Sequence, residues 1–268
     1  MWSPLSTTPI RNEWLIANHL KVNSSKTKFM IFAPKNNTWK NSGKLKLTIG
    51  NSEIIQQVDQ YKYLGIIIDC KLNWEPHIKY ISAKLSKTLG ILFRTRHYLN
   101  KQSLILIFQT LFLSHLRYGI LCWGRCSKTA LKPLTVLMNR ALRCIHFCGY
   151  RDSVKKFYFE LNILHIDDLF KLELAKFMHQ YSNGLLPINF NHYFTKANNT
   201  HNHKTRFLKN NFKIPKQNKN IGLKSLAYLG PKVWSEVPHN IKINPNTYSF
   251  SKMLTNYFLK SCSNNNLT

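Results

Sequence analysis

The stretch Asp69–Leu92, DCKLNWEPHIKYISAKLSKTLGIL, decides the fold because its hydrophobic pattern changes from a strand period to a helix period. Pro76 suits the first turn of a helix, and Asn73 precedes it as a candidate cap. Beyond Pro76 the apolar residues recur at helical spacing and form one core stripe: Ile78, Ile81, Leu85, Leu89 and Leu92. The stretch therefore predicts an amphipathic helix that starts near Pro76.

The side of this helix opposite the stripe is basic. Lys79, Lys87 and Arg94 lie there with Lys84 beside them, and no acid follows Glu75 within the helix. Ordinary solvated faces mix Glu with Lys for i,i+4 pairing. We therefore interpret this face as one that contacts phosphates, with an ordinary solvated face as the alternative.

Before Asp69 the sequence predicts a small antiparallel sheet. Short segments rich in Phe, Ile and Val alternate with turn-rich segments. Tight turns join strands as antiparallel hairpins rather than as a parallel sheet. The predicted strands are Lys28–Phe32, Lys44–Ile49, Glu53–Val58 and Tyr61–Ile68, and a short amphipathic helix is expected over Glu13–Leu20.

After Leu92 the pattern is mainly helical. Residues 189–219 are polar and basic without a single acid, which is typical of a linker or of an arm that orders on binding. The fold class is thus α+β, with a small antiparallel sheet at the N-terminus followed by a mainly helical region. Helices are expected over Gln102–Cys122, Ser127–Phe147, Asp167 or Asp168 to Gly184, and in a terminal segment with Phe250 and Phe258.

The charge of the chain points to an anionic partner. The 268 residues include 39 Lys and Arg against 11 Asp and Glu, a net charge of +28. Such a field repels itself unless a polyanion neutralises it. Nucleic acid is the partner that we favour, because each phosphate contact releases condensed counterions. An A/T-rich coding sequence that enriches Lys and an anionic membrane surface are the alternatives.

Six cysteines without a secretory signal favour free thiols. Cys122 and Cys126, then Cys144 and Cys148, form two i,i+4 pairs with His146 nearby, so a zinc site is one interpretation. Structural zinc sites usually begin with a tighter knuckle. Buried apolar thiols are the interpretation that we favour.

The most apolar stretch, Ser103–Trp123, is long enough to span a bilayer. Ser103, Thr110, Ser114 and Arg117 fall on one narrow arc of a helix, which predicts a buried helix with one wet edge. We therefore expect an intracellular protein, in the nucleus or the cytoplasm, without a membrane partner.

Several short motifs follow one another in an order typical of one family. Together they resemble the C-terminal part (the end of the palm, the thumb and the C-terminal region) of the reverse transcriptase, an RNA-directed DNA polymerase, of jockey-like non-LTR (LINE-type) retrotransposons. The resemblance spans about Glu13 to Leu259. The motifs are Asn23-Ser24-Ser25-Lys26-Thr27, Tyr61-Lys62-Tyr63-Leu64-Gly65-Ile66, Asp69-x-x-Leu72-x-Trp74-x-x-His77-Ile78, Ser114-His115-Leu116-x-Tyr118-Gly119-Ile120, Met138–Arg143 and Gly230-Pro231-Lys232-x-Trp234-x-x-x-Pro238.

The resemblance implies a role for each part: a residual palm over 1–72, a helical thumb over 73–188, and a basic linker with the C-terminal region over 189–268. Lys26 is implied as a general acid toward the departing pyrophosphate, with a plain surface lysine as the alternative. Tyr63, Leu64 and Gly65 match the hairpin that holds the primer end. Contacts with an RNA–DNA hybrid or duplex are expected from Lys62, Tyr63, Leu64, Gly65, Lys79, Lys84, Lys87, Arg94, Arg96, Lys204, Arg206 and Lys209.

We do not find the catalytic carboxylates of that family in this sequence. Polymerases hold two divalent ions, Mg²⁺ in this family, about 4 Å apart with clustered carboxylates. In the family these carboxylates precede the Asn23 motif, and residues 1–12 contain no acid. We therefore expect no cofactor or metal on this chain and no polymerisation by it alone. Asp167-Asp168 imitates the missing turn, but helix capping explains the pair better.

Two alternatives stay open beside a truncated polymerase that binds nucleic acid. The chain could be one exon or fragment of an intact, active reverse transcriptase. It could also be a basic helical protein without a catalytic role.

Overall fold

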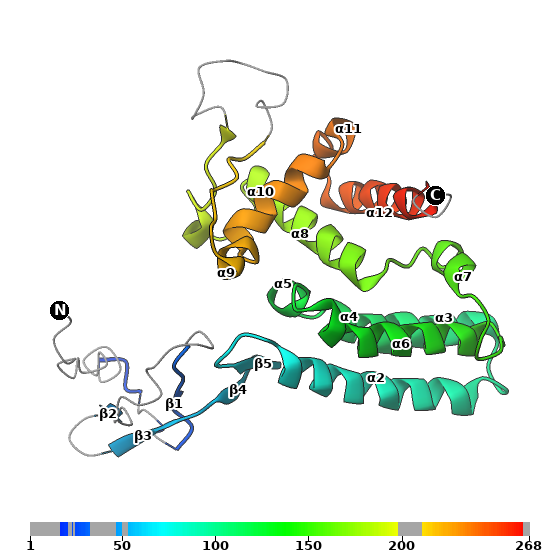
Figure 1. Cartoon of the computed structure of the whole chain (residues 1–268), viewed down its shortest axis with the longest axis horizontal. Coiled ribbons are helices and arrows are strands. Elements are labelled where there is room, and N and C mark those ends of the chain that lie inside the picture. The colour runs from blue at the N-terminus through cyan, green and yellow to red at the C-terminus, as the bar shows by residue number, and fades with distance from the viewer. Residues whose placement is uncertain are drawn as a thin grey trace. The chain divides into compact units, whose positions relative to one another are not determined.

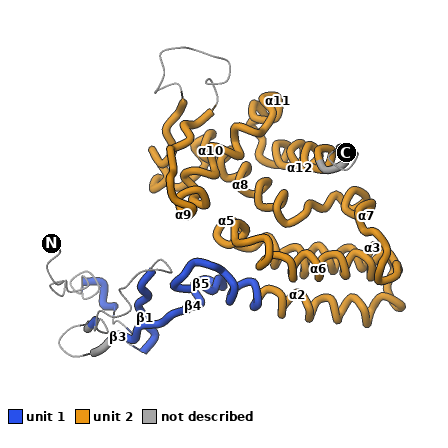
Figure 2. The backbone as a smooth tube through the Cα atoms, in the orientation of Figure 1, with its two compact units in different colours: residues 1–80 blue, residues 81–268 orange. Residues whose placement is uncertain are grey.

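The computed structural model describes residues 17–20, 23, 25–32, 47–49, 53–197 and 211–264 (Figure 1). The chain divides into two compact units, residues 1–80 and residues 81–268 (Figure 2). The boundary lies within helix α2, Glu75–Thr95. Strands lie in the first unit and helices make up the second, which confirms the predicted α+β class.

Two small sheets occupy the first unit. Strands β1, β3 and β2 form one sheet in that order, and β4 pairs with β5 in the other. The antiparallel pairs β2–β3 and β4–β5 are as predicted. Strand β1 pairs in parallel with β3, so the expectation of hairpins alone was wrong there. The bounds are β1 Lys28–Phe29, β2 Leu47–Ile49, β3 Glu53–Gln57, β4 Gln60–Tyr63 and β5 Ile66–Asp69.

The long connection between β1 and β3 permits their parallel pairing. Residues 30–52 separate β1 from β3, and a connection of a dozen residues or more is what a parallel pair requires. The segment Tyr61–Ile68 was predicted as one strand, but it folds back on itself at Leu64 and Gly65. The helix expected over Glu13–Leu20 lies mostly outside the described residues.

Helix α2 begins where the sequence predicts. The Asn73 side chain accepts the backbone N–H of Glu75, the first residue of the helix, at 3.1 Å. Asn73 lies one residue before the N-cap position, because the Trp74 carbonyl accepts the first helical bond, from Ile78. All five residues of the predicted core stripe are buried, with Leu85 and Leu92 fully so. Burying this stripe stabilises the helix far more than its intrinsic propensity does.

The helix predicted over Gln102–Cys122 is broken into consecutive segments. The segments are α3 (Lys101–Ile107), the π-helical η2 (Phe108–Leu113), α4 (Ser114–Arg117) and α5 (Ile120–Trp123). The break lies at Gly119, whose φ of 60° is left-handed and suits glycine. Trp123 holds the turn because its indole N–H donates to the Tyr118 carbonyl at 3.0 Å.

Helix α6 (Lys128–Ile145) lies beside α2 and α3 within the helical layer (Figure 1). Ser127 caps it by accepting the Ala130 N–H. Its apolar face is buried except for Leu137, which is half-buried. The buried residues are Leu134, Met138, Ala141, Leu142 and Ile145.

The rest of the second unit packs around α8 (Ile166–Ser182), which contacts α10 and α12. A Cβ at Gly230 would lie 2.7 Å from the Met178 sulfur, so glycine permits the close approach of α10 to α8. Asp167 and Asp168 lie in the first turn of α8, where the helix dipole favours acids. The other elements are α7 (Lys155–Glu160), η3 (Ile188–Phe190), α9 (Asn220–Leu223), α10 (Leu226–Glu236), α11 (His239–Lys242) and α12 (Thr247–Asn264).

None of the helices in the described part of the chain is long and apolar enough to cross a membrane. The predicted wet edge of the apolar stretch is present, since Thr110, Ser114 and Arg117 are exposed.

Candidate nucleic-acid interface

The β4–β5 hairpin presents an apolar tip. Leu64 and Gly65 form its two-residue loop with φ of 45° and 82°, the two positive values that a type I′ turn requires. Tyr63 is 60% exposed and Leu64 is 71% exposed, so both side chains project into solvent. Left-handed backbone costs a leucine about 1 kcal/mol. The structure thus places Tyr63, Leu64 and Gly65 at the tip of one hairpin.

Lys26 lies in a turn next to the same hairpin. The Asn23 carbonyl and side chain both accept the Lys26 N–H, at 3.2 and 3.1 Å. The lysine is exposed and lines a groove of about 400 Å³ together with Tyr63. Phe29 and Phe32 form part of the apolar wall of that groove. Lys26 and Tyr63, which belong to separate sequence motifs, therefore line one hollow.

Lys62 is engaged within the protein. Its ammonium donates to the Tyr80 hydroxyl at 3.1 Å and lies 4.8 Å from the centre of the Tyr80 ring. A cation–π contact and a hydrogen bond therefore hold this predicted phosphate contact against the first turns of α2. Lys62 supports the hairpin as well as carrying charge.

A buried carboxylate joins the hairpin to α2. Asp69 ends β5 at 6% exposure and accepts the backbone N–H groups of Lys71, Asn73 and Trp74 at 3.1, 3.2 and 2.8 Å. This role of Asp69 was not predicted from the sequence. The sequence feature that could have indicated this role is an aspartate within five residues before a helix start. An Asp there can accept backbone N–H groups that have no partner within the helix.

His77 completes this junction from the helix side. Its Nδ1 accepts the Ile67 N–H at 3.2 Å, and the ring is 2% exposed. Burial lowers the pKa of His77 from 6.5 to about 4. The imidazole is therefore neutral at physiological pH, as an acceptor of a backbone N–H has to be.

We expect the His77 pKa to make stability depend on pH. Because the folded-state pKa is depressed, the contribution of His77 is fully present above pH 6.5 and is lost as pH falls toward 4. The slope in that window approaches about 1.4 kcal/mol per pH unit. Urea unfolding of the wild type and of His77→Gln from pH 7 to pH 4 measures it. The wild type should lose about 2 kcal/mol more than the variant, whereas parallel curves would contradict the assignment.

The predicted basic face of α2 is present. Lys79, Lys87 and Arg94 are exposed, and Lys84 is half-buried near His115. Burial, and then the charge of Lys84, lower the pKa of His115, so that histidine adds no positive charge at neutral pH. Arg96 differs from the other cations because its guanidinium lies 4.9 Å from the centre of the Phe147 ring. Arg96 therefore fastens the end of α2 to the end of α6.

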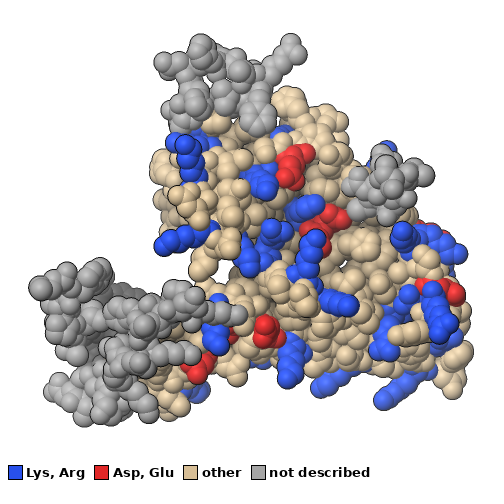
Figure 3. All heavy atoms as spheres, viewed as in Figure 1, with Lys and Arg blue, Asp and Glu red and all other residues tan. Residues whose placement is uncertain are grey.

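Helix α6 carries a second set of cations that the sequence analysis did not select. Lys128, Lys132, Arg140 and Arg143 are its ionised residues, and it has no acid. Residues 76–151 hold 13 Lys and Arg and no Asp or Glu. This run without acids is the sequence feature that could have indicated the cations of α6. Figure 3 shows blue side chains along the α2 and α6 region with few red ones.

The remaining predicted contacts, Lys204, Arg206 and Lys209, lie outside the described residues. The described cysteines are free thiols. Of the two predicted pairs, Cys144 is buried and Cys126 and Cys148 are half-buried, whereas Cys122 is exposed, so the prediction of buried thiols was wrong for Cys122. Burial raises the pKa of Cys126 to about 11. Within the described ranges no three His, Cys, Asp or Glu side chains are placed to hold a metal ion.

Comparison with known proteins gives matches at low identity. The chain is 28% identical over 138 residues to a probable RNA-directed DNA polymerase from transposon BS of Drosophila melanogaster, a match that covers 49% of this chain and 14% of that protein. It is 25% identical over 134 residues to the RNA-directed DNA polymerase from mobile element jockey of Drosophila funebris, covering 48% and 14%. A third match, at 23% identity over 52% of the chain and 15% of the relative, is a probable RNA-directed DNA polymerase from transposon X-element of Drosophila melanogaster.

The chain thus matches about one seventh of the length of these relatives. No family model matches the chain. No solved structure matches it either. The curated relatives confirm the resemblance to jockey-like non-LTR retrotransposon RNA-directed DNA polymerases.

Proposed function

We propose that this chain is the nucleic-acid-gripping part of a non-LTR retrotransposon reverse transcriptase, and that it binds RNA–DNA hybrids or duplexes through their phosphates without polymerising alone. The observation that carries the proposal is the run of 13 cations without an acid over residues 76–151. In the described structure this run supplies the exposed cations of α2 and α6.

The distribution of the acids supports this proposal over a compositional origin of the charge. An A/T-rich coding sequence would enrich Lys along the whole chain, but it would not by itself remove Asp and Glu from particular helices. Yet α8 alone contains three acids, and two of them pair with lysines: Lys171 with Asp168 at 3.3 Å, and Lys176 with Glu173 at 2.8 Å. The solvated face of α8 thus uses i,i+3 pairs. The cations of α6 have no acid in their own helix, which suits an external anion.

The first unit fits a role at the primer end. We propose that the Tyr63–Gly65 tip supports the end of a duplex and that Lys26 supplies a proton to a leaving group in the complete polymerase. The shared groove of Lys26 and Tyr63 supports this assignment. The metal-holding carboxylates would come from another part of the enzyme, because the buried Asp69 already accepts three backbone N–H groups.

Binding of the purified chain to a labelled RNA–DNA hybrid, with primer extension in Mg²⁺ alongside, tests the proposal. We expect binding that weakens steeply with added salt, since phosphate contacts release counterions, and no extension of the primer. Extension would contradict the expected lack of polymerisation. Absence of binding at low salt would contradict nucleic-acid recognition itself.

A further inference from the structure

The C-terminal ends of α2 and α6 meet in the second unit, and aromatic and basic side chains gather there (Figure 1). The Arg96 guanidinium lies 4.9 Å from the centre of the Phe147 ring, and the His97 ring lies edge-on to the same ring, with centres 6.3 Å apart. The Arg140 guanidinium lies 5.9 Å from the centre of the Tyr150 ring. We call this region the arginine–aromatic surface, and its members are Arg96, Tyr98, Arg140, Phe147, Tyr150 and Arg151.

Two tyrosines of this surface project into solvent. Tyr98 is 89% exposed and Tyr150 is 75% exposed, so neither ring contributes much to the core. A single exposed tyrosine would need no explanation. Here, however, Tyr98 directly follows His97, and Tyr150 lies three residues after Phe147, so both tyrosines are close in the chain to the contact between α2 and α6. A flat ligand could therefore meet several rings at one place.

Phe147 adopts a backbone conformation that usually belongs to glycine. Helix α6 ends in a Schellman motif, in which the Cys148 N–H donates to the Arg143 carbonyl at 3.0 Å and Phe147 has a φ of 56°. The left-handed conformation costs a residue with a Cβ about 1 kcal/mol. Phe147 stays 52% exposed in spite of its contact with Arg96, so burial does not offset this cost. An external ligand accounts better for an aromatic ring at this position.

The loop that carries Tyr150 is held in place by hydrogen bonds. The Asp152 carboxylate accepts the Gly149 N–H at 2.7 Å, and the Asp152 N–H donates to the Gly149 carbonyl at 3.2 Å. The Nε of Arg143 donates to the Asp152 carbonyl at 2.9 Å. A ligand that stacks on Tyr150 thus meets a loop that is already ordered, so little conformational entropy is lost on binding.

The charge around this surface is supplied by arginine. Residues 94–98 and 140–151 contain five of the nine arginines of the chain and no lysine. Guanidinium groups stack on aromatic rings and on bases and also contact phosphates, whereas an ammonium group acts as a point charge. The acids nearby have partners of their own: Asp152 holds the loop, and Glu160 lies 3.9 Å from the Lys101 ammonium and 3.7 Å from His146.

We propose that the arginine–aromatic surface binds single-stranded nucleic acid, with unpaired bases stacked on its exposed rings and the phosphates held by its arginines. The inference rests on the proposed nucleic-acid binding and adds a single-stranded ligand to it. Proteins that hold single strands combine aromatic rings, which stack on any base, with cations that follow the backbone. Paired bases stack on each other and hide their faces, so a grip on duplex alone would not use these rings.

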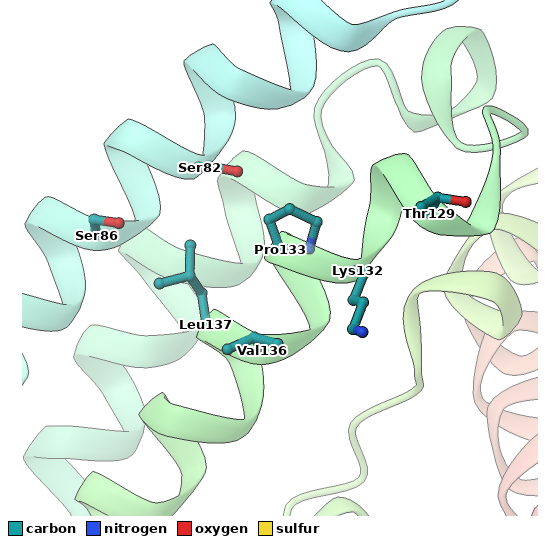
Figure 4. Close-up of a pocket in the computed structure, with 7 residues that line it drawn as sticks. All are labelled: Ser82, Ser86, Thr129, Lys132, Pro133, Val136 and Leu137. Atoms are coloured by element: carbon teal, nitrogen blue, oxygen red, sulfur yellow. The ribbon is translucent and has the colours of Figure 1, made fainter.

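The N-terminal halves of α2 and α6 differ from this surface. A hollow of about 480 Å³, the α2–α6 hollow, lies between them (Figure 4). Ser82 and Ser86 line it from α2, and α6 residues between Thr129 and Leu137 line it from the other side. Lys132 is its one charged residue, and none of the described residues that line it is aromatic. Stacking on bases is therefore a property of the C-terminal ends of these helices and not of their whole length.

The test compares the affinity of the full chain, at one salt concentration, for four forms of one RNA–DNA hybrid. One form is blunt, and the others carry a single-stranded tail of about eight nucleotides. The tails consist of thymidines, of uridines, or of abasic deoxyribose phosphates, which supply the phosphates without the bases. We expect a tail with bases to raise the affinity about 10- to 100-fold above that of the abasic tail. A gain with only one of the two base-containing tails supports the inference and identifies DNA or RNA as the strand.

Tyr98→Ala and Tyr150→Ala should each lower the affinity for the base-containing tails by about 5- to 10-fold and leave the affinity for the blunt hybrid unchanged. Tyr150→Phe keeps the ring and should keep the affinity. Tyr248→Ala is the matched control, since Tyr248 lies on α12 and is similarly exposed, at 78%. All three tyrosines are exposed, so the variants should fold, and their thermal unfolding midpoints check this.

Two kinds of result overturn the inference. If the abasic tail raises the affinity as much as the tails with bases, or if Tyr98→Ala and Tyr150→Ala both bind every form as the wild type does, the surface does not stack on bases, while duplex binding stands. If not even the blunt hybrid binds at low salt, the inference fails together with the proposed function.

Discussion

Replacing four cations of the α2–α6 face with glutamine is expected to weaken binding of an RNA–DNA hybrid by about 100- to 1000-fold at low salt. Each lost phosphate contact should also reduce the slope of log affinity against log salt by about 0.9, or by roughly 3 to 4 for the set. All four side chains are exposed, so their loss should leave the fold intact. The residues are Lys87, Arg94, Lys128 and Arg140.

A control with the same change of net charge separates local contacts from the overall field. Lysines of α7, α8 and α12 provide it. This second variant should retain most of the salt slope, because its cations lie outside the proposed face. Equal losses in both variants would mean that the charge of the whole chain, and not α2 and α6, attracts the nucleic acid. The control positions are Lys155, Lys171, Lys176 and Lys252.

Asp69→Ala is expected to be the most damaging single change in the first unit. It removes the acceptor of three backbone N–H groups in a buried turn. We expect the free energy of unfolding to fall by about 3 kcal/mol or more, since orphaned buried donors carry a desolvation cost. Chemical denaturation followed by tryptophan fluorescence measures the loss. Trp74, one of six tryptophans, donates one of the three bonds through its backbone N–H.

Asp69→Asn is the graded control for that experiment. Its side-chain oxygen can still accept the two N–H groups bound by one carboxylate oxygen, while the bond to Trp74 is lost. A loss of about half that of the alanine variant is expected. Equal, small losses would indicate that the turn is held by packing and not by the carboxylate.

The helical part of the fold was accessible from the sequence because its signals are local. The stripe from Ile78 to Leu92 has the helical period, and the Asn73 side chain bonds to the first helical N–H, close to the predicted start. The break at Gly119 was missed because one glycine inside a long apolar pattern is a weak signal. The parallel pairing of β1 with β3 depends on contacts between distant residues, which periodicity does not report.

The charged residues of the candidate site could be predicted from the sequence, but most of their contacts could not. The sequence selected the exposed cations Lys79, Lys87 and Arg94, which lie where the helical period puts them. It could not indicate that Lys62 contacts Tyr80 or that Arg96 contacts Phe147, because each contact joins residues from different elements. The α2–α6 hollow was also missed, since it exists only in three dimensions.

At residue 64, fold stability and ligand recognition favour different side chains, because the backbone of Leu64 is left-handed. Glycine or asparagine at residue 64 would relax the turn, because both tolerate φ of about 45° better than leucine does. Either change would also remove a large apolar side chain that is 71% exposed at the hairpin tip. Selection for a stable fold alone would therefore replace this leucine, whereas selection for a tip that packs against a ligand would retain it.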